Sequence, residues 1–502
     1  MIEPTVDREA ARGGAANLLG ALVSAAVNLV IVAVIARGLP KVDAGAFFGA
    51  TSLFVIVATA ARIGTDVSVV HFLARARALS EPQALGGFVR AAVIPVLAAG
   101  GVAALCLAVA TPALLDLIAD DEVAQGDLLV ATVALVVPIA AAYDALIAAT
   151  RGLGATRPTV VVERLLRPSL QALLIALAVL GGGGAYAAVL AWLVPYVLAA
   201  AIAAWWLSRL LRRAGGDVGV RLDRRTRSRF WRFTWPPAVT GVLQITLQRL
   251  DILLVGGLLG PAEAAVYAAA TRIVVVGQLV NQAIAHSVQA QLAMALAVGD
   301  VPAARRLYQV STAWIVAITW PVYLTVALGA PLILALIGPG YESGISTMVV
   351  LAVAGLISAA AGLVDFVLIT FGKTTWSLSN TAFALLVNVV ADLLLIPEIG
   401  IVGAAIGWAL AIAAAKFLPL IQVGRQFGFQ PASRAGLIVA SLALTCFGAV
   451  PGAVLLLFGP TSWAVPAAIL AGGAIYVRQL AARRGDLALD SLRPERSNAA
   501  VV

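Results

Sequence analysis

Apolar runs of about 18 residues or more recur along the whole chain, and they constrain its fold more than any other feature. Each run is long enough to cross a hydrocarbon core of roughly 30 Å as a helix. The chain has 502 residues, of which 62% are hydrophobic and only 12% are charged. A water-soluble domain of this composition could not cover its surface with polar groups. The sequence therefore predicts an all-α polytopic membrane protein.

The apolar runs predict fourteen membrane spans. We place them at 15–36, 46–66, 89–112, 128–149, 161–180, 185–206, 234–258, 264–288, 307–328, 346–370, 376–396, 402–423, 435–458 and 462–480. Of the 34 Lys and Arg residues, only Arg37 and Lys41 fall in loops opposite the N-terminus. Four more lie within spans: Arg62, Arg249, Arg272 and Lys416. The rest, including the arginines between 151 and 167, are assigned to the N-terminal side. The positive-inside rule then predicts a multi-pass protein of the plasma (inner) membrane with both termini in the cytoplasm.

The two halves of the chain repeat at an offset of 220 residues. GLPKVDAGAFFGATSLFV (38–55) aligns with LLGPAEAAVYAAATRIVV (258–275), and Asp144 corresponds to Asp365 within one residue. Six helices per repeat is an even number, so the two units have the same orientation in the membrane. We expect two pseudo-symmetric six-helix lobes, with the last two spans outside the repeat. Transporters built in this way bind substrate between their halves and alternate access by rocking them.

The repeat and the spans define the expected domains. They are a leader (1–14), an N-lobe (15–206), a basic linker (207–233), a C-lobe (234–423), a helix pair (435–480) and a polar tail (481–502). The linker combines nine arginines with Phe230 and Trp231, which predicts an interfacial segment against anionic lipid headgroups. The flanking spans argue against nucleic acid as a partner for these arginines.

Several polar side chains lie inside the apolar runs at helical spacing. A formal charge in hydrocarbon is disfavoured by about 2.5–3.5 kcal/mol, so such residues face a partner, a cavity or a substrate. The stripes comprise Ser24 and Asn28 in span one, Gln248 and Asp251 in span seven, and Gln278 and Gln282 in span eight. They either line a water-accessible cavity or pair between helices as packing contacts. The charges that accompany the stripes favour a cavity.

Three segments carry a resemblance to a known family. They are the Arg-x-Asp of span seven leading into G-P-x-E-x-x-x-Y-x-x-A-x-R (249–272), the first hairpin (38–54), and NVVADLLLIPEIGIVGAAIGWAL (388–410). They resemble the Wzx-like polysaccharide flippases of the multidrug/oligosaccharidyl-lipid/polysaccharide (MOP) superfamily, which also contains lipid II flippases and MATE drug exporters. The resemblance implies a MATE-like fold and the translocation of a lipid-linked oligosaccharide to the outer leaflet for cell-surface polysaccharide biosynthesis. The implied partners are the lipid-linked glycan, membrane lipid, and a polysaccharide polymerase with glycosyltransferases.

The implied substrate has an anionic diphosphate and a polar glycan, which require a wet, partly cationic cavity. The candidate lining residues are Arg272, Arg249, Asn28, Ser24, Gln248, Gln278, Gln282, Asp144 and Arg62. Arg272 is the first choice for a diphosphate contact, because guanidinium groups match phosphate oxygens. The alternative is a salt bridge from Arg272 to Asp251 or Asp365. Arg62 has the i,i+4 spacing for a salt bridge with Asp66, and Lys416 either extends to the membrane surface or meets Asp365.

Asp251, Asn388 and Asp392 form a candidate ion-coupling set. Carboxylate and amide oxygens from two helices could hold Na⁺, and a pair of aspartates could instead exchange a proton. The set resembles the sodium site of some lipid II flippases. The structural alternative is that Asp392 caps a helix end and Asn388 packs. The cysteines and histidines show no metal-ligand spacing, so no cofactor other than a coupling ion is expected.

Departures from related families leave two alternative functions open. Lipid II flippases carry arginines within span one and at the position of Ser52, which this chain lacks. MATE exporters have twelve spans, so a cation-coupled drug antiporter is the other alternative. A glycosyltransferase or ligase would need a large loop with acidic or His residues for acid/base chemistry. The longest outer loop, 113–127, has no His, and we expect no enzymatic activity.

Overall fold

A computed structural model describes residues 4–118, 123–217, 219–459 and 463–483 of the chain. Within these ranges the regular structure is entirely helical, and the predicted all-α polytopic architecture is confirmed. Twelve helices in the described ranges are long and apolar enough to cross a membrane. The other two predicted spans, 161–180 and 264–288, fall on helical segments that are not among these twelve. Fourteen is therefore an approximate count.

The chain divides into two compact units, each described here by itself. Unit 1 comprises Met1–Ala269 and Ile396–Ile401, and unit 2 comprises Ala270–Leu395 and Val402–Val502. The helices that begin in unit 1 are α1 (Pro4–Gly38), α2 (Lys41–Arg62), α3 (Thr65–Ala78), α4 (Pro82–Val109), α5 (Thr111–Ile118), α6 (Gly126–Gly152), the π-helix η1 (Thr159–Leu166), α7 (Arg167–Leu180), α8 (Ala185–Arg213), α9 (Arg224–Leu259) and α10 (Pro261–Ala297). Of the expected basic linker, only 214–223 lies outside these helices.

The helices that begin in unit 2 continue the chain to its last described residues. They are α11 (Val301–Ile337), the short η2 (Glu342–Gly344), α12 (Ile345–Ala360), α13 (Val364–Thr370), α14 (Thr374–Ile399), α15 (Ile401–Phe427), α16 (Arg434–Ala443), the π-helix η3 (Leu444–Ala449), α17 (Val450–Phe458) and α18 (Ala464–Ala482). Several of these helices begin about 220 residues after a helix of the first half: α11 follows α4, and α15 follows α8 at a slightly shorter spacing. The element order thus follows the sequence repeat.

A sharp break separates α2 from α3 where a continuous span 46–66 was expected. Ile63 and Gly64 both adopt left-handed backbone conformations, with φ of 51° and 69°. A Cβ atom on Gly64 would lie 2.6 Å from the backbone nitrogen of Ala238 in α9. Glycine is therefore required at position 64 for two reasons, its positive φ and the close approach of α9. The break turns α3 so that its first turn faces the same helix, α9, as the end of α2 does.

The entry to α7 is also irregular. Residues Thr159–Leu166 form a π-helix, whose wide turn continues without interruption into α7. Arg164 and Arg167, which the charge count grouped with the loop 151–167, both lie inside this helical segment, as the predicted span 161–180 implies. π-helical segments are rare and are often found at functional sites.

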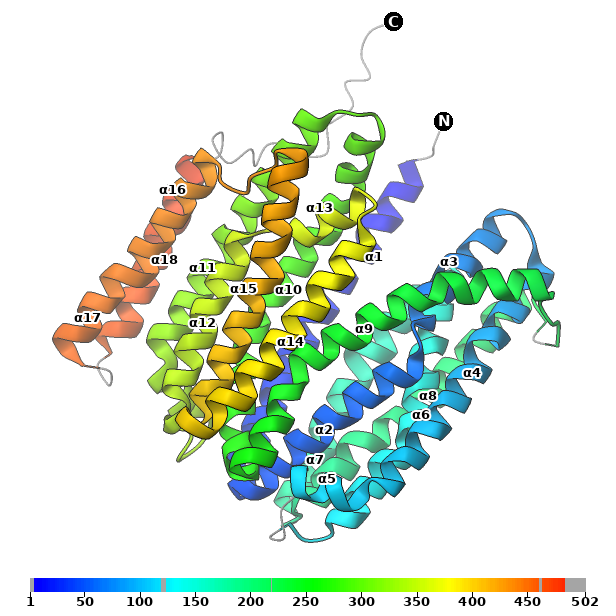
Figure 1. Ribbon diagram of the computed structural model, residues 1–502, viewed down its shortest axis with the longest axis horizontal. Helices are drawn as coiled ribbons and strands as arrows, with labels where there is room; N and C mark the ends of the chain where they lie inside the picture. The colour runs from blue at the N-terminus through cyan, green and yellow to red at the C-terminus, as the bar shows by residue number, and fades with distance from the viewer. Residues whose placement is uncertain (1–3, 119–122, 218, 460–462, 484–502) are drawn as a thin grey trace, which may run out of the picture. The chain divides into compact units, whose positions relative to one another are not determined.

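The core of unit 1 packs α3, α4, α6 and α8 around the first turns of α9. Phe72, Phe88 and Phe230 form its aromatic centre, with ring centroids 5.2 Å apart for the first two. Figure 1 shows α4, α6 and α8 running side by side in blue and cyan, with the green α9 in the same unit. Phe230 is completely buried, so it fixes one face of α9 against the unit.

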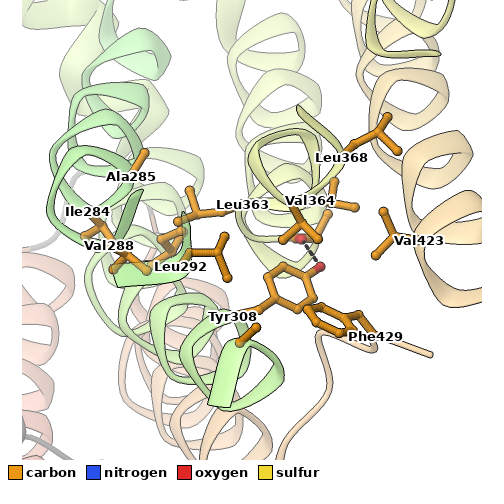
Figure 2. Close-up of a cluster of buried hydrophobic side chains, with 14 of the residues drawn as sticks. Ile284, Ala285, Val288, Leu292, Tyr308, Leu363, Val364, Leu368, Val423 and Phe429 are labelled. Atoms are coloured by element: carbon orange, nitrogen blue, oxygen red, sulfur yellow. Dashed lines mark hydrogen bonds between the residues drawn. The ribbon is translucent and has the colours of Figure 1, made fainter. Parts of the chain in front are cut away.

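The core of unit 2 gathers around Tyr308 in α11. Its hydroxyl group donates a 2.8 Å hydrogen bond to the carbonyl oxygen of Ala361, and its ring stacks near Phe429 (Figure 2). The carbonyl lies in the turn between α12 and α13, so this bond holds the turn against α11. The last helices pack on α11 as well, where the Tyr476 hydroxyl group donates a 2.9 Å hydrogen bond to the carbonyl oxygen of Ala317.

Candidate functional site

The break between α2 and α3 creates a small charged cluster in unit 1. Arg62, the last residue of α2, places Nη1 3.6 Å from Oδ2 of Asp66 in α3. The same Nη1 lies 3.4 Å from Oδ2 of Asp144 in α6. The expected salt bridge between Arg62 and Asp66 is therefore present, and Asp144 is an additional partner. All three side chains are only partly exposed, which strengthens their interaction relative to a surface pair.

A cleft of about 410 Å³ opens beside this cluster. One wall comes from the end of α2 and the start of α3, and the other from α9. Its polar lining consists of Thr59, Arg62, Asp66, Thr240, Gln244 and Gln248. Gln248 of the predicted span-seven stripe thus faces a cavity, together with Gln244 one turn earlier. The volume of the cleft lies within the range of small-molecule sites.

A second cluster in unit 1 surrounds Arg167, which the sequence analysis missed as a site residue. Its guanidinium carbon lies 4.6 Å from the ring centroid of Tyr196 in α8 and 5.9 Å from that of Tyr143 in α6. These distances place the cation over two aromatic rings. In the described part of the chain, no carboxylate lies within ion-pair distance of Arg167. Its positive charge is therefore balanced by aromatic rings rather than by an adjacent anion.

The Arg167 cluster adjoins the Arg62 cluster through neighbouring residues of α6. Tyr143 and Asp144 are consecutive, and the carboxylate of Asp144 is within electrostatic range of Arg167. Glu163 in η1 lies 3.4 Å from Arg151. The interior of unit 1 thus holds cations and carboxylates from several helices.

Arg249 and Asp251 lie in the second half of α9. The Arg249 side chain is half-buried, and Tyr196 is within its electrostatic range. Asp251 is only 2% exposed and accepts a 2.6 Å hydrogen bond from the hydroxyl group of Tyr267. Tyr267 is the tyrosine of the G-P-x-E-x-x-x-Y segment, so this bond joins α9 to the start of α10 within unit 1.

The polar stripe of α1 is accessible. Asn28 is exposed, and its Nδ2 donates a 2.7 Å hydrogen bond to the backbone carbonyl of Ser24 one turn earlier. Ser24 itself is partly buried. Because the Asn28 side chain is exposed, its amide group is accessible from outside the helix.

In unit 2, Asn388 and Asp392 form a buried pair on α14. Both side chains are fully buried, and Asn388 Nδ2 donates a 3.2 Å hydrogen bond to Asp392 Oδ2. The Asp392 carboxylate also packs directly against Gly407 of α15, leaving no space for a Cβ atom there. Two of the three predicted ion-coupling residues are therefore together. The third, Asp251, belongs to unit 1.

The remaining predicted residues lie on α10, α13 and α15. Arg272 and Gln278 are partly buried on α10, and Gln282 is exposed. Lys416 Nζ lies 2.6 Å from Asp365 Oδ2. The open question of whether Lys416 meets Asp365 is thus answered by an ion pair between α15 and α13.

Comparisons with known proteins complete the description. The family model for "Polysaccharide biosynthesis protein" matches residues 10–289. Among solved structures, the lipid II flippase MurJ in its inward closed conformation is similar with a TM-score of 0.71 and 12% identity, over 93% of this chain and 98% of that one. An inward-facing multidrug resistance MATE family transporter of the MOP superfamily is similar with a TM-score of 0.65 and 16% identity, over 81% of this chain and 94% of that one.

A MOP superfamily transporter from Pyrococcus furiosus is also similar, with a TM-score of 0.58 and 15% identity over 83% of this chain and 95% of that one. No curated protein matches the sequence. At these identities the similarity extends to the fold alone, and it confirms the predicted MATE-like fold.

Proposed function

Because this chain belongs to the polysaccharide biosynthesis protein family, we propose that it is a flippase for a polyprenyl-diphosphate-linked oligosaccharide. The match over residues 10–289 is the observation that carries the proposal. The shared fold also supports transport, since the solved structures named above are a flippase and a transporter. The protein moves the glycolipid across the plasma membrane by alternating access, with both of its termini in the cytoplasm.

The charges inside unit 1 support an anionic headgroup as cargo. Arg62, Arg167 and Arg249 come from three different elements, and a guanidinium group can bind a diphosphate through paired hydrogen bonds. Arg62 is already neutralised by two carboxylates. Arg167 is held by aromatic rings instead, and it keeps its charge available to a phosphate oxygen. We therefore add Arg167 to Arg272 as a proposed diphosphate contact.

The glycan and the prenyl chain place different demands on the protein. Amide side chains such as Gln248, Gln278 and Asn28 can donate and accept hydrogen bonds to sugar hydroxyl groups. The prenyl chain is hydrocarbon and stays in lipid. A coupling ion, Na⁺ or a proton, at the buried pair of Asn388 and Asp392 would link the cargo step to an ion gradient.

The proposal is tested in a deletion strain complemented with variants. We expect Arg272→Ala and Arg167→Ala each to reduce surface glycan by at least about tenfold, because a lost charged hydrogen bond costs roughly 1.5–3 kcal/mol. Lipid-linked sugars should accumulate on the cytoplasmic side at unchanged protein abundance. The matched control is Arg306→Ala, an exposed arginine at the start of α11.

The same strains separate the alternatives. Normal surface glycan in the deletion strain, with lost resistance to cationic drugs, would show a drug antiporter. Arrested peptidoglycan synthesis with accumulated lipid II would show a lipid II flippase. Either result would overturn the proposed cargo.

A further inference from the structure

The first three turns of α9 carry a row of arginines on one face. Arg225, Arg229 and Arg232 are spaced by four and three residues, so they lie on one side of the helix. With Arg224 and Ser228 they line an open groove of about 620 Å³. We call the five residues the arginine stripe. All of them are exposed, so the groove is accessible from outside the protein.

The opposite face of the same turns is buried. Phe230 and Thr234 are both 0% exposed, and Phe230 packs among Phe72 and Phe88 in the core of unit 1. The helix cannot turn the stripe inward without exposing this aromatic residue. The stripe is therefore a fixed outer surface of the unit.

Within the described part of the chain, no carboxylate balances the stripe. In the described ranges, none of its four arginines takes part in an ion pair. The nearest acid in sequence, Asp223, is used as the helix cap and accepts hydrogen bonds from the backbone nitrogens of Arg225 and Thr226 at 3.0 and 3.2 Å. Four adjacent exposed guanidinium groups create a positive surface that attracts anions.

The length of α9 places the stripe at the level of lipid headgroups. The helix has 36 residues and is thus about 54 Å long, well beyond a hydrocarbon core of roughly 30 Å. Its apolar part, 237–259, is sufficient to cross that core. Trp235, 66% exposed, follows the stripe on nearly the same face. Exposed tryptophans mark the boundary between hydrocarbon and headgroups.

We propose that the arginine stripe of α9 is a binding site for the headgroup of an anionic phospholipid, with the Trp235 ring packed beside the upper part of its acyl chains. Guanidinium groups bind the lipid phosphate in pairs, and the groove between Arg225, Arg229 and Arg232 accommodates it. The inference stands independently of the transported cargo, because it concerns an outer face of unit 1.

The test uses the full chain in detergent, titrated with phosphatidylglycerol and followed by native mass spectrometry. We expect the triple variant Arg225→Gln/Arg229→Gln/Arg232→Gln to bind this lipid at least about tenfold more weakly. Each arginine near an anionic surface contributes about a fivefold factor before screening by salt. The matched control is Arg212→Gln/Arg213→Gln/Arg227→Gln, which removes the same charge from exposed positions off the stripe. It should bind as the native protein does.

Two further arms keep the proposal falsifiable. The triple lysine variant, Arg225→Lys/Arg229→Lys/Arg232→Lys, retains the charge and should retain most of the lipid binding. It separates the loss of charge from a loss of folding in the glutamine variant. Equal loss of binding in the stripe and control variants would overturn the proposal. Displacement of phosphatidylglycerol by inorganic pyrophosphate at similar concentration would also overturn it, by showing a general phosphate site. Binding of phosphatidylcholine with the same affinity would do the same.

Discussion

At the scale of single residues, each half of the chain holds an aspartate that pairs with a cation from another helix. Asp144 lies 3.4 Å from Arg62, and Asp365 lies 2.6 Å from Lys416. The two aspartates correspond at the repeat offset within one residue. Their cations come from nonequivalent elements, α2 and α15. A carboxylate in an apolar bundle requires a counter-charge, and the two halves supply it differently.

These pairs show what could be predicted from the sequence at this scale. The Arg62–Asp66 contact was predicted from i,i+4 spacing on one helix, and it forms although a helix break lies between the two residues. The Lys416–Asp365 contact joins residues 51 positions apart, and no local pattern decides between it and an extended lysine. Arg167 was missed because the charge count grouped it with the loop 151–167. Only the aromatic rings of Tyr143 and Tyr196 from other helices reveal its environment.

The buried pair of Asn388 and Asp392 gives a prediction for the coupling ion. If Na⁺ binds there, Na⁺ should raise the melting temperature of the purified protein relative to equimolar K⁺, because a ligand that binds only the folded state stabilises it. Asp392→Asn should abolish this difference by removing the charged ligand. Asn380→Asp, elsewhere on α14, is the control that leaves the pair intact. Equal melting of the native protein in Na⁺ and K⁺ would leave a proton as the coupling ion.

At the scale of elements, the break between α2 and α3 determines where the Arg62 cluster lies. A continuous span was expected over 46–66, since the single Gly64 is no reliable signal for a helix end. The left-handed pair Ile63–Gly64 becomes understandable only with α9 in place, because the backbone of α9 approaches at that point. The helices themselves were predictable from apolar length. Their interruptions depend on tertiary contacts.

Gly64→Ala tests this break. The added Cβ atom meets the α9 backbone, so we expect a loss of about 2–4 kcal/mol in stability, from the clash together with the cost of a positive φ. Gly182→Ala is the matched control, since Gly182 has a φ of 76° but nothing within 4 Å of its Cβ position. It should lose only about 1 kcal/mol, from the backbone conformation alone. If the melting temperature falls equally in the two variants, the contact of Gly64 with α9 does not contribute to stability.

At the scale of the whole molecule, the repeat and the membrane class were readable from the sequence, because both depend on patterns longer than any single contact. Helix starts recur at an offset near 220, and the fold is shared with transporters at only 12–17% identity. The division of the chain into its two compact units is harder to predict from the sequence. α9 begins the second repeat, yet it packs on α2 and belongs to unit 1. Which helix partners which is decided by surfaces such as the one around Phe230.

The predicted topology can be checked with single cysteines. In a background of Cys106→Ser/Cys446→Ala, Glu81→Cys should be protected from a membrane-impermeant thiol reagent in intact cells, and Asp127→Cys should be labelled. Both positions are exposed in the structure, so labelling reports on the side of the membrane. Permeabilised cells provide the control, in which both react. The opposite pattern would invert the orientation of the chain.

The π-helical segment Thr159–Leu166 affects how the sequence of this chain is aligned with those of its relatives. A π-turn contains one more residue than an α-turn, so counting by 3.6 across it assigns the side chains on its two ends to the wrong sides of the helix. A relative with one residue fewer in this segment would present the same face, and a gap placed there is the correct alignment rather than an error.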